Sequence, residues 1–385
     1  MGPINTVKTC MYNAMEASVD PNQFGGVKAS STAFALIKMV DYVAKNLDKP
    51  GTFVRMLLVD FAKAFDLVDH TIVLEKLSSL GVHESLVRWS ASFLNERSQC
   101  VKIGSSLFEV ARIHAGCPQG TIMGPLVFVT HINDLHPPGQ VMTIKYVDDT
   151  NILHASNDSE DTTLQQAATY LCEWSKTNNM KFNIKKSKEI IFHSTKCAED
   201  FLPITIADDE IERVGEAKIL GVIIREDLKW NSHVEYMLKK ANKRLYLLTL
   251  CRRAGLKQSD MLCIYTSLIR SIVEYCAVVW HSNLPKYLSD AVEKVQKRAL
   301  HVIYGIDDYD ECLKLSGLNL LSERREEQCR NLFKSIQMSS HKLHSLLPSH
   351  RDMSYNLRDF STYQPILCHT NRYSNSFIPY CVKKF

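Results

Sequence analysis

The stretch "TIKYVDDTNIL", Thr143 to Leu153, places two adjacent aspartates between two short apolar runs. The two runs predict a β-hairpin with Asp148 and Asp149 at its tip, where Asn-Gly or Asp-Gly would be the low-strain choice. Neighbouring carboxylates raise each other's pKa unless a cation lies between them. The pair is therefore either a surface turn without a functional role or a metal-binding site. The dipeptide alone does not decide, because Asp208-Asp209 and Asp307-Asp308 repeat it in polar segments.

The composition indicates a folded protein. With 385 residues the chain is long enough for two or three domains with ample core, and 45% apolar and 23% charged residues are ordinary for globular proteins. A net charge of +4 is too small to indicate nucleic-acid binding by itself. The 12 cysteines lack zinc-site spacing. Because no signal-peptide pattern begins the chain, we interpret them as reduced, mostly buried thiols and predict an intracellular protein, in the nucleus and/or cytoplasm and not secreted.

A buried strand is predicted just upstream of another acid. Thr52 to Val59 is a continuous apolar run too short for a helix, so it predicts a central strand that ends at Asp60. Asp69 can then cap a helix that Gly81 closes. If this strand and the hairpin are neighbours, three carboxylates meet, and hard cations such as Mg²⁺ take oxygen ligands of this kind. Taken alone, Asp60, Asp66 and Asp69 are more typical of turns and helix caps.

The remaining pattern predicts an α+β fold up to about residue 225 and helices beyond it. Helical spacing predicts helices near residues 31–46, 84–95 and 161–177, and another that ends near residue 135. Gly104-Ser105-Ser106 predicts a hairpin, and residues 188–193 a strand. The longest apolar stretch, Cys263 to Trp280, contains Arg270 and Glu274. We therefore interpret it as a buried helix or helix pair and predict no membrane span.

The segment "GCPQGTIMGP", Gly116 to Pro125, offers glycines that let the backbone pass close to a flat ligand. Gln119 adds a hydrogen-bond donor and an acceptor. By itself this pattern is more typical of a turn that opens a helix.

Residues 239–257, "KKANKRLYLLTLCRRAGLK", carry seven cations and no acid. At helical spacing one face is apolar and the other is a row of cations, as in a helix that lies along a phosphate backbone. A merely solvated face would usually mix Glu with Lys, so we favour phosphate contact; a calmodulin-like or membrane-surface helix stays open. The predicted nucleic-acid contacts are Lys239, Lys240, Lys243, Arg244, Arg252, Arg253 and Lys257.

Five segments occur in an order and spacing that resemble the palm motifs of the reverse transcriptases of non-LTR (LINE-like) retrotransposons. They are "LLVDFAKAFDLVDH", "GCPQGTIMGPLVF", "IKYVDDTNIL", "NMKFNIKKSKEIIF" and "KILGV". The similarity continues to "TNRYSNSFIPYCVKKF" and so covers nearly the whole chain. It implies a right-hand polymerase fold, with an antiparallel palm sheet and packed helices, fingers and an all-α thumb.

The resemblance also implies a division of the chain into domains. Residues 1–50 would be partial fingers, 51–225 the palm, 226–305 a helical thumb and 306–385 a helical or irregular C-terminal region, with "KILGV" as a primer-grip hairpin. Only "DPNQFGGVKASST" resembles the fingers, so we expect an N-terminally truncated protein without an upstream endonuclease. Gly26-Val27-Lys28 stands where many relatives carry an arginine, and Val147 replaces the commoner alanine.

The resemblance gives the acids and one lysine catalytic roles. Asp60, Asp148 and Asp149 would bind two Mg²⁺ ions, or Mn²⁺ in their place. Lys186, in "NIKKS", would protonate the leaving pyrophosphate.

It also implies a nucleotide site. Phe61 would offer its backbone carbonyl as a further metal ligand, and Phe65 would screen the 2′ position of the sugar. Gln119 and Gly120 would pack against the incoming nucleotide and the template, with Tyr146 beside the acidic tip.

The predicted function is RNA-directed DNA polymerisation, with an RNA template, a DNA primer and dNTPs as partners. The alternative is an inactive truncated remnant that folds and binds RNA without polymerising; the intact acids, Phe65 and Gln119 favour the enzyme. A two-metal nuclease would use the acids but explains neither Phe65 nor the basic helix. The sequence makes no prediction about the oligomeric state.

Overall fold

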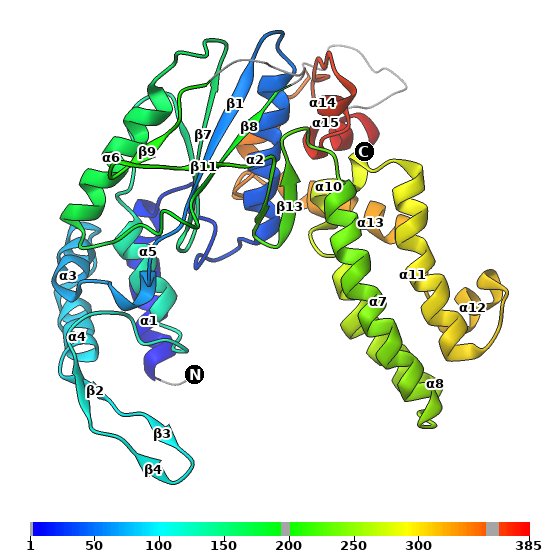
Figure 1. Ribbon diagram of the computed structural model, residues 1–385, viewed down its shortest axis with the longest axis horizontal. Helices are drawn as coiled ribbons and strands as arrows, with labels where there is room; N and C mark the ends of the chain where they lie inside the picture. Colours follow the sequence, from blue (N-terminus) through cyan, green and yellow to red (C-terminus); the bar gives the residue numbers. More distant parts are fainter. Residues whose placement is uncertain (1–2, 194–200, 352–361) are drawn as a thin grey trace. The chain divides into compact units, whose positions relative to one another are not determined.

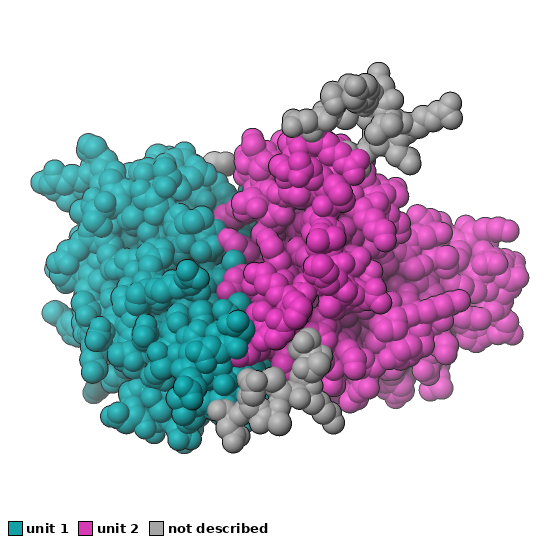
Figure 2. Space-filling view, turned by 90° about the horizontal axis from the view of Figure 1, so that it is seen from above, with its two compact units in different colours: residues 1–35, 54–191, 197–214 teal, residues 36–53, 192–196, 215–385 magenta. Residues whose placement is uncertain are grey.

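The computed structural model describes residues 3–193, 201–351 and 362–385. The chain divides into two compact units, which Figure 2 distinguishes by colour. The first unit contains residues 1–35, 54–191 and 197–214, and the second contains residues 36–53, 192–196 and 215–385.

A five-stranded sheet forms the centre of the first unit (Figure 1). The hairpin strands β6 and β7 are antiparallel, with Tyr146 opposite Asp149, whereas the edge strand β11 joins β8 in parallel. The predicted strand β1 is buried along nearly its whole length, which explains its unbroken apolar run. The strand order is β11 (Glu212–Arg213), β8 (Lys188–Phe192), β1 (Phe53–Val59), β7 (Asp149–Ser156) and β6 (Met142–Tyr146).

Helices pack with this sheet into one core. Asp69 caps α3 as predicted, because its carboxylate accepts the backbone N–H groups of Thr71 and Ile72. The helix α5 is buried on all sides, in keeping with its apolar sequence. An N-terminal helix that the sequence analysis did not predict, α1, contributes Met11 and Met15 to the core. The helices are α1 (Pro3–Met15), α3 (His70–Ser79), α4 (Glu84–Leu94), α5 (Gly124–Ile132) and α6 (Thr163–Thr177).

A long hairpin arm extends from the end of α4 (Figure 1). The predicted turn at Gly104 is present, but the ladder is interrupted, so that β2 (Arg97–Gln99) pairs with β5 (Ala111–Ile113) and β3 (Lys102–Ile103) pairs with β4 (Ser106–Leu107). The arm exposes the large apolar side chains of Val101, Ile103, Leu107, Phe108 and Val110.

The second unit contains one hairpin and a set of helices. The "KILGV" segment forms the predicted hairpin, β12 (Glu216–Ile219) and β13 (Val222–Arg225). Beyond it the described residues form no further named strand, as expected, and α7 and α11 pack along one another (Figure 1). The main helices are α2 (Thr32–Leu47), most of which lies in this unit, α7 (Asn231–Arg253), α8 (Gln258–Ile264), α11 (Lys286–Tyr304), α12 (Tyr309–Ser316), α13 (Leu321–Ile336) and α15 (Phe377–Lys384).

The apolar run after α8 is irregular. It passes through a π-helical turn, η3 (Tyr265–Arg270), and the short helices α9 (Ser271–Val273) and α10 (Ala277–Trp280), which Cys276 separates with φ 49°. By length and composition alone, residues 258–283 could cross a membrane, a test that core helices of soluble proteins also pass. Tyr265, Ile269 and Val273 are buried within the unit, which agrees with the predicted buried helix pair.

The cysteines depart in part from the prediction. The 11 described cysteines are all free thiols, but only Cys117, Cys312, Cys329 and Cys381 are buried, so "mostly buried" was wrong. Periodicity did not reveal that several lie on the outer faces of their helices.

Candidate active site

Three acids are brought together by neighbouring strands. Asp60 directly follows β1, and Asp148 and Asp149 lie where β6 turns into β7, the neighbour of β1 in the sheet. Lost hydration, followed by the charges of Asp148 and Asp60, raises the pKa of Asp149 to about 6. Lost hydration also raises the pKa of Asp148, with a further contribution from Asp60. The three carboxylates therefore repel one another across a shared space.

The other Asp-Asp pairs have local structural roles. Asp208 lies in the tight turn between β9 (Thr205–Ile206) and β10 (Asp209–Glu210), with φ 68°. Asp308 caps α12 by accepting the N–H groups of Asp310 and Glu311. Neither role requires a cation, so the pair at residues 148–149 differs from them by its surroundings and not by its sequence.

The backbone of the acidic tip is strained, and residues from outside the hairpin hold the tip in place. Of its two loop residues only Val147 has a positive φ, 58°, as in a type II′ turn, where glycine is usual at this position. A β-branched residue is strained there. The side-chain oxygen of Gln23 accepts the N–H of Val147 at 3.0 Å, and it also accepts the N–H of Gly25 at 3.0 Å. A Cβ on Gly25 would lie 2.6 Å from the Val147 nitrogen, so only glycine fits beside the tip.

A buried lysine ties the same hairpin to α5. Lys145 is fully buried, and its ammonium donates to the carbonyls of Ile132, Asn133 and Leu135 at 3.0, 3.2 and 3.1 Å. These carbonyls follow the end of α5, where backbone acceptors lack helical partners. Asp20 completes the cluster 2.6 Å from the ammonium. Burial lowers the pKa of Lys145, and the charge of Asp20 opposes this.

The turn that carries Lys186 is bound to the backbone of Asp60. The Asp60 N–H donates to the hydroxyl of Ser187 at 3.2 Å, and the Asp60 carbonyl accepts the N–H of Asn183 at 2.8 Å. The Ser187 hydroxyl in turn donates to the Asn183 carbonyl. Lys186 is exposed on this turn. The predicted catalytic lysine and the first catalytic acid thus belong to one hydrogen-bonded unit.

The two predicted phenylalanines have different surroundings. Phe61 is buried, with its ring 5.2 Å from that of Phe182, so only its backbone remains for a ligand. Phe65 is half-buried and stacks on Phe128 of α5 with ring centroids 4.9 Å apart. Phe65 is therefore not fully enclosed by the core, and its role beside a sugar stays a prediction.

The loop with Gln119 and Gly120 is docked against the Phe65 turn. The Cys117 N–H donates to the Phe65 carbonyl at 2.7 Å, and a Cβ on Gly116 would lie 2.9 Å from the Asp66 carbonyl oxygen. Gln119 and Gly120 are exposed, and the Gln119 amide donates to the Asp66 carboxylate at 2.9 Å. Asp66 ends the 3-10 turn Ala64–Asp66, as expected of a turn residue, and is the partner of Gln119. Tyr146, half-buried, closes the β6 strand opposite Asp149.

The basic helix α7 is only partly available for phosphate. All seven predicted cations are exposed. Arg244 donates to the Leu268 carbonyl at 3.3 Å, and Arg252 donates to the Val302 carbonyl at 2.9 Å at the end of α11. These two arginines therefore bind backbone carbonyls of their own unit and are less available for phosphate. The helix also exposes Tyr246 and Leu247, so its apolar and cationic faces are less separate than predicted.

The three acids offer the oxygen ligands that a hard cation prefers, but they do not form a complete metal site by themselves. Within the described ranges no group of three or more His, Cys, Asp or Glu side chains lies close enough together to hold a metal ion. Asp60, Asp148 and Asp149 are near enough for their charges to interact, but the assignment of metal ions to them stays a prediction. The carboxylate oxygens and the raised pKa values of Asp148 and Asp149 nevertheless fit a divalent cation, which would relieve this repulsion.

Similarity to known proteins identifies the family of the chain. Residues 4–224 match the family described as reverse transcriptase (RNA-dependent DNA polymerase). The chain belongs to this family. It is 23% identical over 344 residues to a probable RNA-directed DNA polymerase from transposon X-element of Drosophila melanogaster, covering 86% of this chain and 36% of that protein. It is 25% identical over 299 residues to the polymerase from mobile element jockey of Drosophila funebris, covering 74% and 32%.

The reverse transcriptase chain thus spans about a third of the length of these curated relatives. Apo telomerase from Candida tropicalis, a solved structure, has a TM-score of 0.49 at 11% identity, covering 89% of this chain and 55% of that one. The predicted resemblance to LINE-like reverse transcriptases and the α+β fold class are confirmed. The domain boundaries stay predictions, and residues 352–361 of the predicted C-terminal region lie outside the described residues.

Sequence reasoning missed the residues that hold the acidic tip in place. More than a hundred positions separate the tip acids Asp148 and Asp149 from Asp20, Gln23 and Gly25. Lys145 looked like an ordinary strand residue. The signals available were the paired glycines of "QFGG" and a lysine inside an apolar strand. Both were visible, but neither indicated its partner.

Proposed function

We propose that this reverse transcriptase chain catalyses RNA-directed DNA synthesis, by transferring a nucleotidyl group from a dNTP to a primer 3′-OH on an RNA template, as part of a LINE-like element. The observation that carries the proposal is the gathering of Asp60, Asp148 and Asp149 from adjacent strands, where lost hydration and neighbouring carboxylate charge raise the pKa values of Asp148 and Asp149. The family match supports the reaction type. Its location in the nucleus and/or cytoplasm stays a prediction.

The three acids would hold two Mg²⁺ ions, or Mn²⁺ in their place. Bound there, the ions would supply charge neutralisation at the triphosphate and a lowered pKa at the primer hydroxyl. The contribution of the chain is to present carboxylates from two rigid strand ends. Gln23 and Gly25 keep the second strand end at its position. Phosphoryl transfer depends mainly on positioning and electrostatics, so this support is part of the mechanism.

The remaining site residues would act on the nucleotide. Lys186, anchored to Asp60 through Ser187, would donate a proton to the departing pyrophosphate. Phe65, fixed by Phe128, would exclude a 2′-hydroxyl by bulk. The exposed loop at Gln119 and Gly120 would contact the base pair that forms. The cations of α7 would bind the primer–template backbone.

The test is primer extension on a primed RNA template by Asp148→Asn, which removes ligand charge without changing side-chain volume. We expect a loss of about a thousandfold or more, equivalent to several kcal/mol of lost transition-state stabilisation. Asp208→Asn is the matched control, because it makes the same change in the same dipeptide within an exposed turn. Circular dichroism should show both variants folded.

A second measurement, thermal stabilisation by Mg²⁺, does not depend on polymerase activity. Mg²⁺ should raise the melting temperature of the wild type and of Asp208→Asn, and raise that of Asp148→Asn much less. Equal extension rates for the wild type and Asp148→Asn would contradict the proposed function. Equal stabilisation of the two by Mg²⁺ would contradict the metal assignment.

A further inference from the structure

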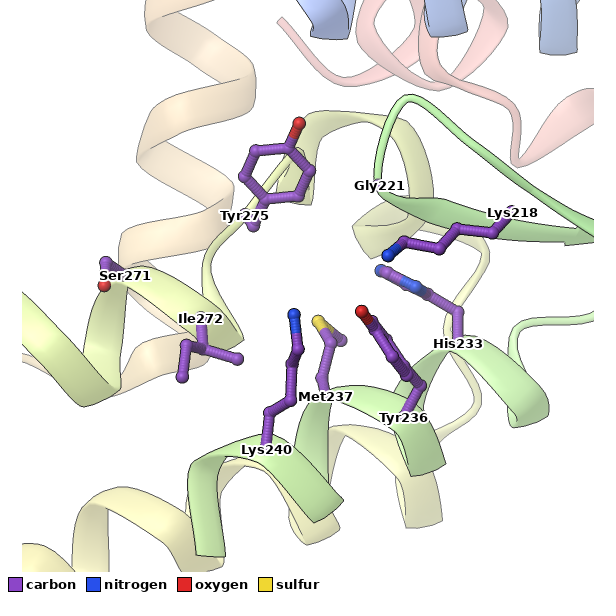
Figure 3. Close-up of a pocket in the computed structure, with 9 residues that line it drawn as sticks. All are labelled: Lys218, Gly221, His233, Tyr236, Met237, Lys240, Ser271, Ile272 and Tyr275. Carbon is purple, nitrogen blue, oxygen red and sulfur yellow. The ribbon is translucent and has the colours of Figure 1, made fainter. Parts of the chain in front are cut away.

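A pocket in the second unit lies between the hairpin β12–β13, the helix α7 and the residues after η3 (Figure 3). Its volume is about 240 Å³, enough for a small organic molecule. Figure 3 shows Lys218 from the hairpin and Tyr236 and Lys240 from α7 directed toward one space, with Ile272 across from them. The pocket shares Lys240 with the predicted nucleic-acid contacts and Lys218 with the predicted primer-grip hairpin, but the proposed nucleotidyl transfer assigns it no ligand.

Two ammonium groups converge on one side of the pocket. The Lys240 nitrogen lies 4.7 Å from the centre of the Tyr236 ring, and the Lys218 nitrogen lies 5.1 Å from it. The two neighbouring ammonium groups lower the pKa of Tyr236. No Asp or Glu is among the described residues that line the pocket. Two like charges held this close without a lining acid attract an anion.

A buried donor also faces this space. His233 is 1% exposed, and its Nδ1 accepts the N–H of Ile223 at 3.3 Å. Burial lowers the pKa of His233 to about 4, so the neutral ring carries its proton on Nε2. In the described structure Nε2 has no hydrogen-bond partner. Figure 3 shows the ring directed toward the lysine nitrogens, so a bound acceptor would satisfy the donor.

The rest of the lining is mostly apolar. Met237 is buried and lies on α7 between Tyr236 and Lys240 (Figure 3). On the hairpin side, the Tyr275 hydroxyl donates to the Leu220 carbonyl at 2.9 Å. A Cβ on Gly221 would lie 2.9 Å from the Tyr275 ring, so the ring rests directly on the hairpin tip. This arrangement leaves an aromatic surface against which a flat ring can pack.

We propose that this pocket binds a small aromatic phosphate monoester, with its phosphate between Lys218 and Lys240 and its ring against Tyr275. A monoester carries close to two negative charges at neutral pH, whereas the phosphodiester of a nucleic-acid strand carries one. Two ammonium groups and a neutral N–H donor favour the monoester. Both free nucleotides and other aryl phosphates have this chemistry.

The ligand test is isothermal titration calorimetry of the whole chain with phenyl phosphate, inorganic phosphate and methyl phenyl phosphate. We expect saturable binding of phenyl phosphate and at least about tenfold weaker binding of the other two, which lack the ring or one charge. No saturable binding of phenyl phosphate would overturn the proposal. Equal binding of the diester would also overturn it, because the pocket would then suit a strand phosphate.

Variants locate the site. Lys218→Met and Lys240→Met should each weaken phenyl phosphate binding by about tenfold or more, since each removes one charge-assisted hydrogen bond. Lys240→Arg should keep most of the affinity. Lys239→Met is the matched control, because Lys239 is an exposed cation on the same helix that does not line the pocket. Equal weakening by Lys239→Met and Lys240→Met would place the binding outside the pocket and overturn the proposal.

Discussion

The hairpin β6–β7 and the hairpin β12–β13 both turn through two residues, yet their tips differ in charge and in how they are held. Each tip places a bulky residue at positive φ, Val147 at 58° and Leu220 at 46°, which is a strained backbone conformation. At the first tip Asp148 follows Val147, and the Gln23 side chain accepts the Val147 N–H. At the second tip Gly221 follows at φ 87°, as type I′ turns prefer, and the Tyr275 hydroxyl donates to the Leu220 carbonyl. The tip that carries the acids thus combines strain with two neighbouring negative charges, where position matters most.

The difference between the tips is tested most directly at the glycines beside them. Gly25→Ala should have the largest effect, because its Cβ would lie 2.6 Å from both the nitrogen and a methyl carbon of Val147. A displacement of the acids by about 1 Å costs on the order of a hundredfold in rate. The free energy of unfolding should fall by about 1–3 kcal/mol. Primer extension and urea unfolding measure the two.

Two further glycines serve as controls. Gly215→Ala should change little, since its Cβ would come no nearer than 3.4 Å to Glu226. Gly221→Ala should cost stability at the other tip, through its φ of 87° and the Tyr275 ring, while stabilisation by Mg²⁺ persists. If Gly25→Ala extends primers as fast as Gly215→Ala, the position of the acidic tip does not depend on the close packing of Gly25 against Val147.

Phe65 tests whether the acidic tip belongs to a nucleotide site. Its ring stacks on Phe128 at 4.9 Å, and removing the ring should open space for a 2′-hydroxyl if Phe65 faces the sugar as the resemblance implies. Phe65→Val should lower the preference for dNTP over rNTP by about 10- to 100-fold, the range in which bulk excludes a hydroxyl. Single-nucleotide incorporation kinetics measure this ratio. Phe65→Tyr, which keeps the ring, should preserve the preference, and an unchanged ratio in Phe65→Val would make Phe65 a packing residue only.

The charge at the acidic tip should make stability depend on pH. The pKa of Asp149 is about 6 in the folded protein, whereas the ordinary aspartate value is 3.8, so the folded state binds more protons between these values. Without divalent cations, the free energy of unfolding should therefore fall as pH rises through this window. Asp149→Asn should flatten this part of the profile, and Mg²⁺ should restore stability above pH 6 in the wild type. Thermal melts in EDTA and in Mg²⁺ measure both.

Asp209→Asn is the control for that profile, since Asp209 is exposed at the start of β10. A profile that Asp149→Asn leaves unchanged would mean that the acids do not interact in solution.

The smallest expected effect concerns the cations of the second unit. Lys239→Glu with Lys243→Glu should reduce the log–log salt slope of primer–template binding by roughly 0.7–0.9 for each phosphate that the helix no longer neutralises. Arg252→Met is the contrasting variant, because Arg252 donates to carbonyls at the end of α11. Arg252→Met should lower the free energy of unfolding by about 1 kcal/mol and leave the salt slope of primer–template binding nearly unchanged. Fluorescence anisotropy at several salt concentrations provides the slopes, and the reverse pattern would assign phosphate binding to Arg252.

Local sequence signals predicted the elements of this fold well. The apolar run before Asp60, the Asp69 cap and the hairpin at "KILGV" depend on neighbours in the chain, so periodicity and turn chemistry suffice. The gathering of Asp60 with the acidic tip followed from the placement of acids at strand ends.

The support of the site could not be predicted in this way. Gln23 reaches Val147 across 124 positions, and Lys145 caps a helix from a strand. Which distant partner a buried polar group finds depends on tertiary packing. The same limit applies to Arg244 and Arg252, whose exposed positions on a basic helix gave no indication that they bind backbone carbonyls.

The π-helical turn at Tyr265–Arg270 has a consequence for insertions and deletions. A π-turn holds one residue more than the α-helical period, so it accommodates an extra residue while the flanking helices keep the same faces toward their neighbours. Deleting a single residue there would return the turn to the regular period and leave Tyr275 on the hairpin tip. A deletion from a regular α-helical turn such as those of α7 would instead rotate all that follows by about 100°. The π-turn is therefore the part of this helical run in which a change of length is most readily tolerated.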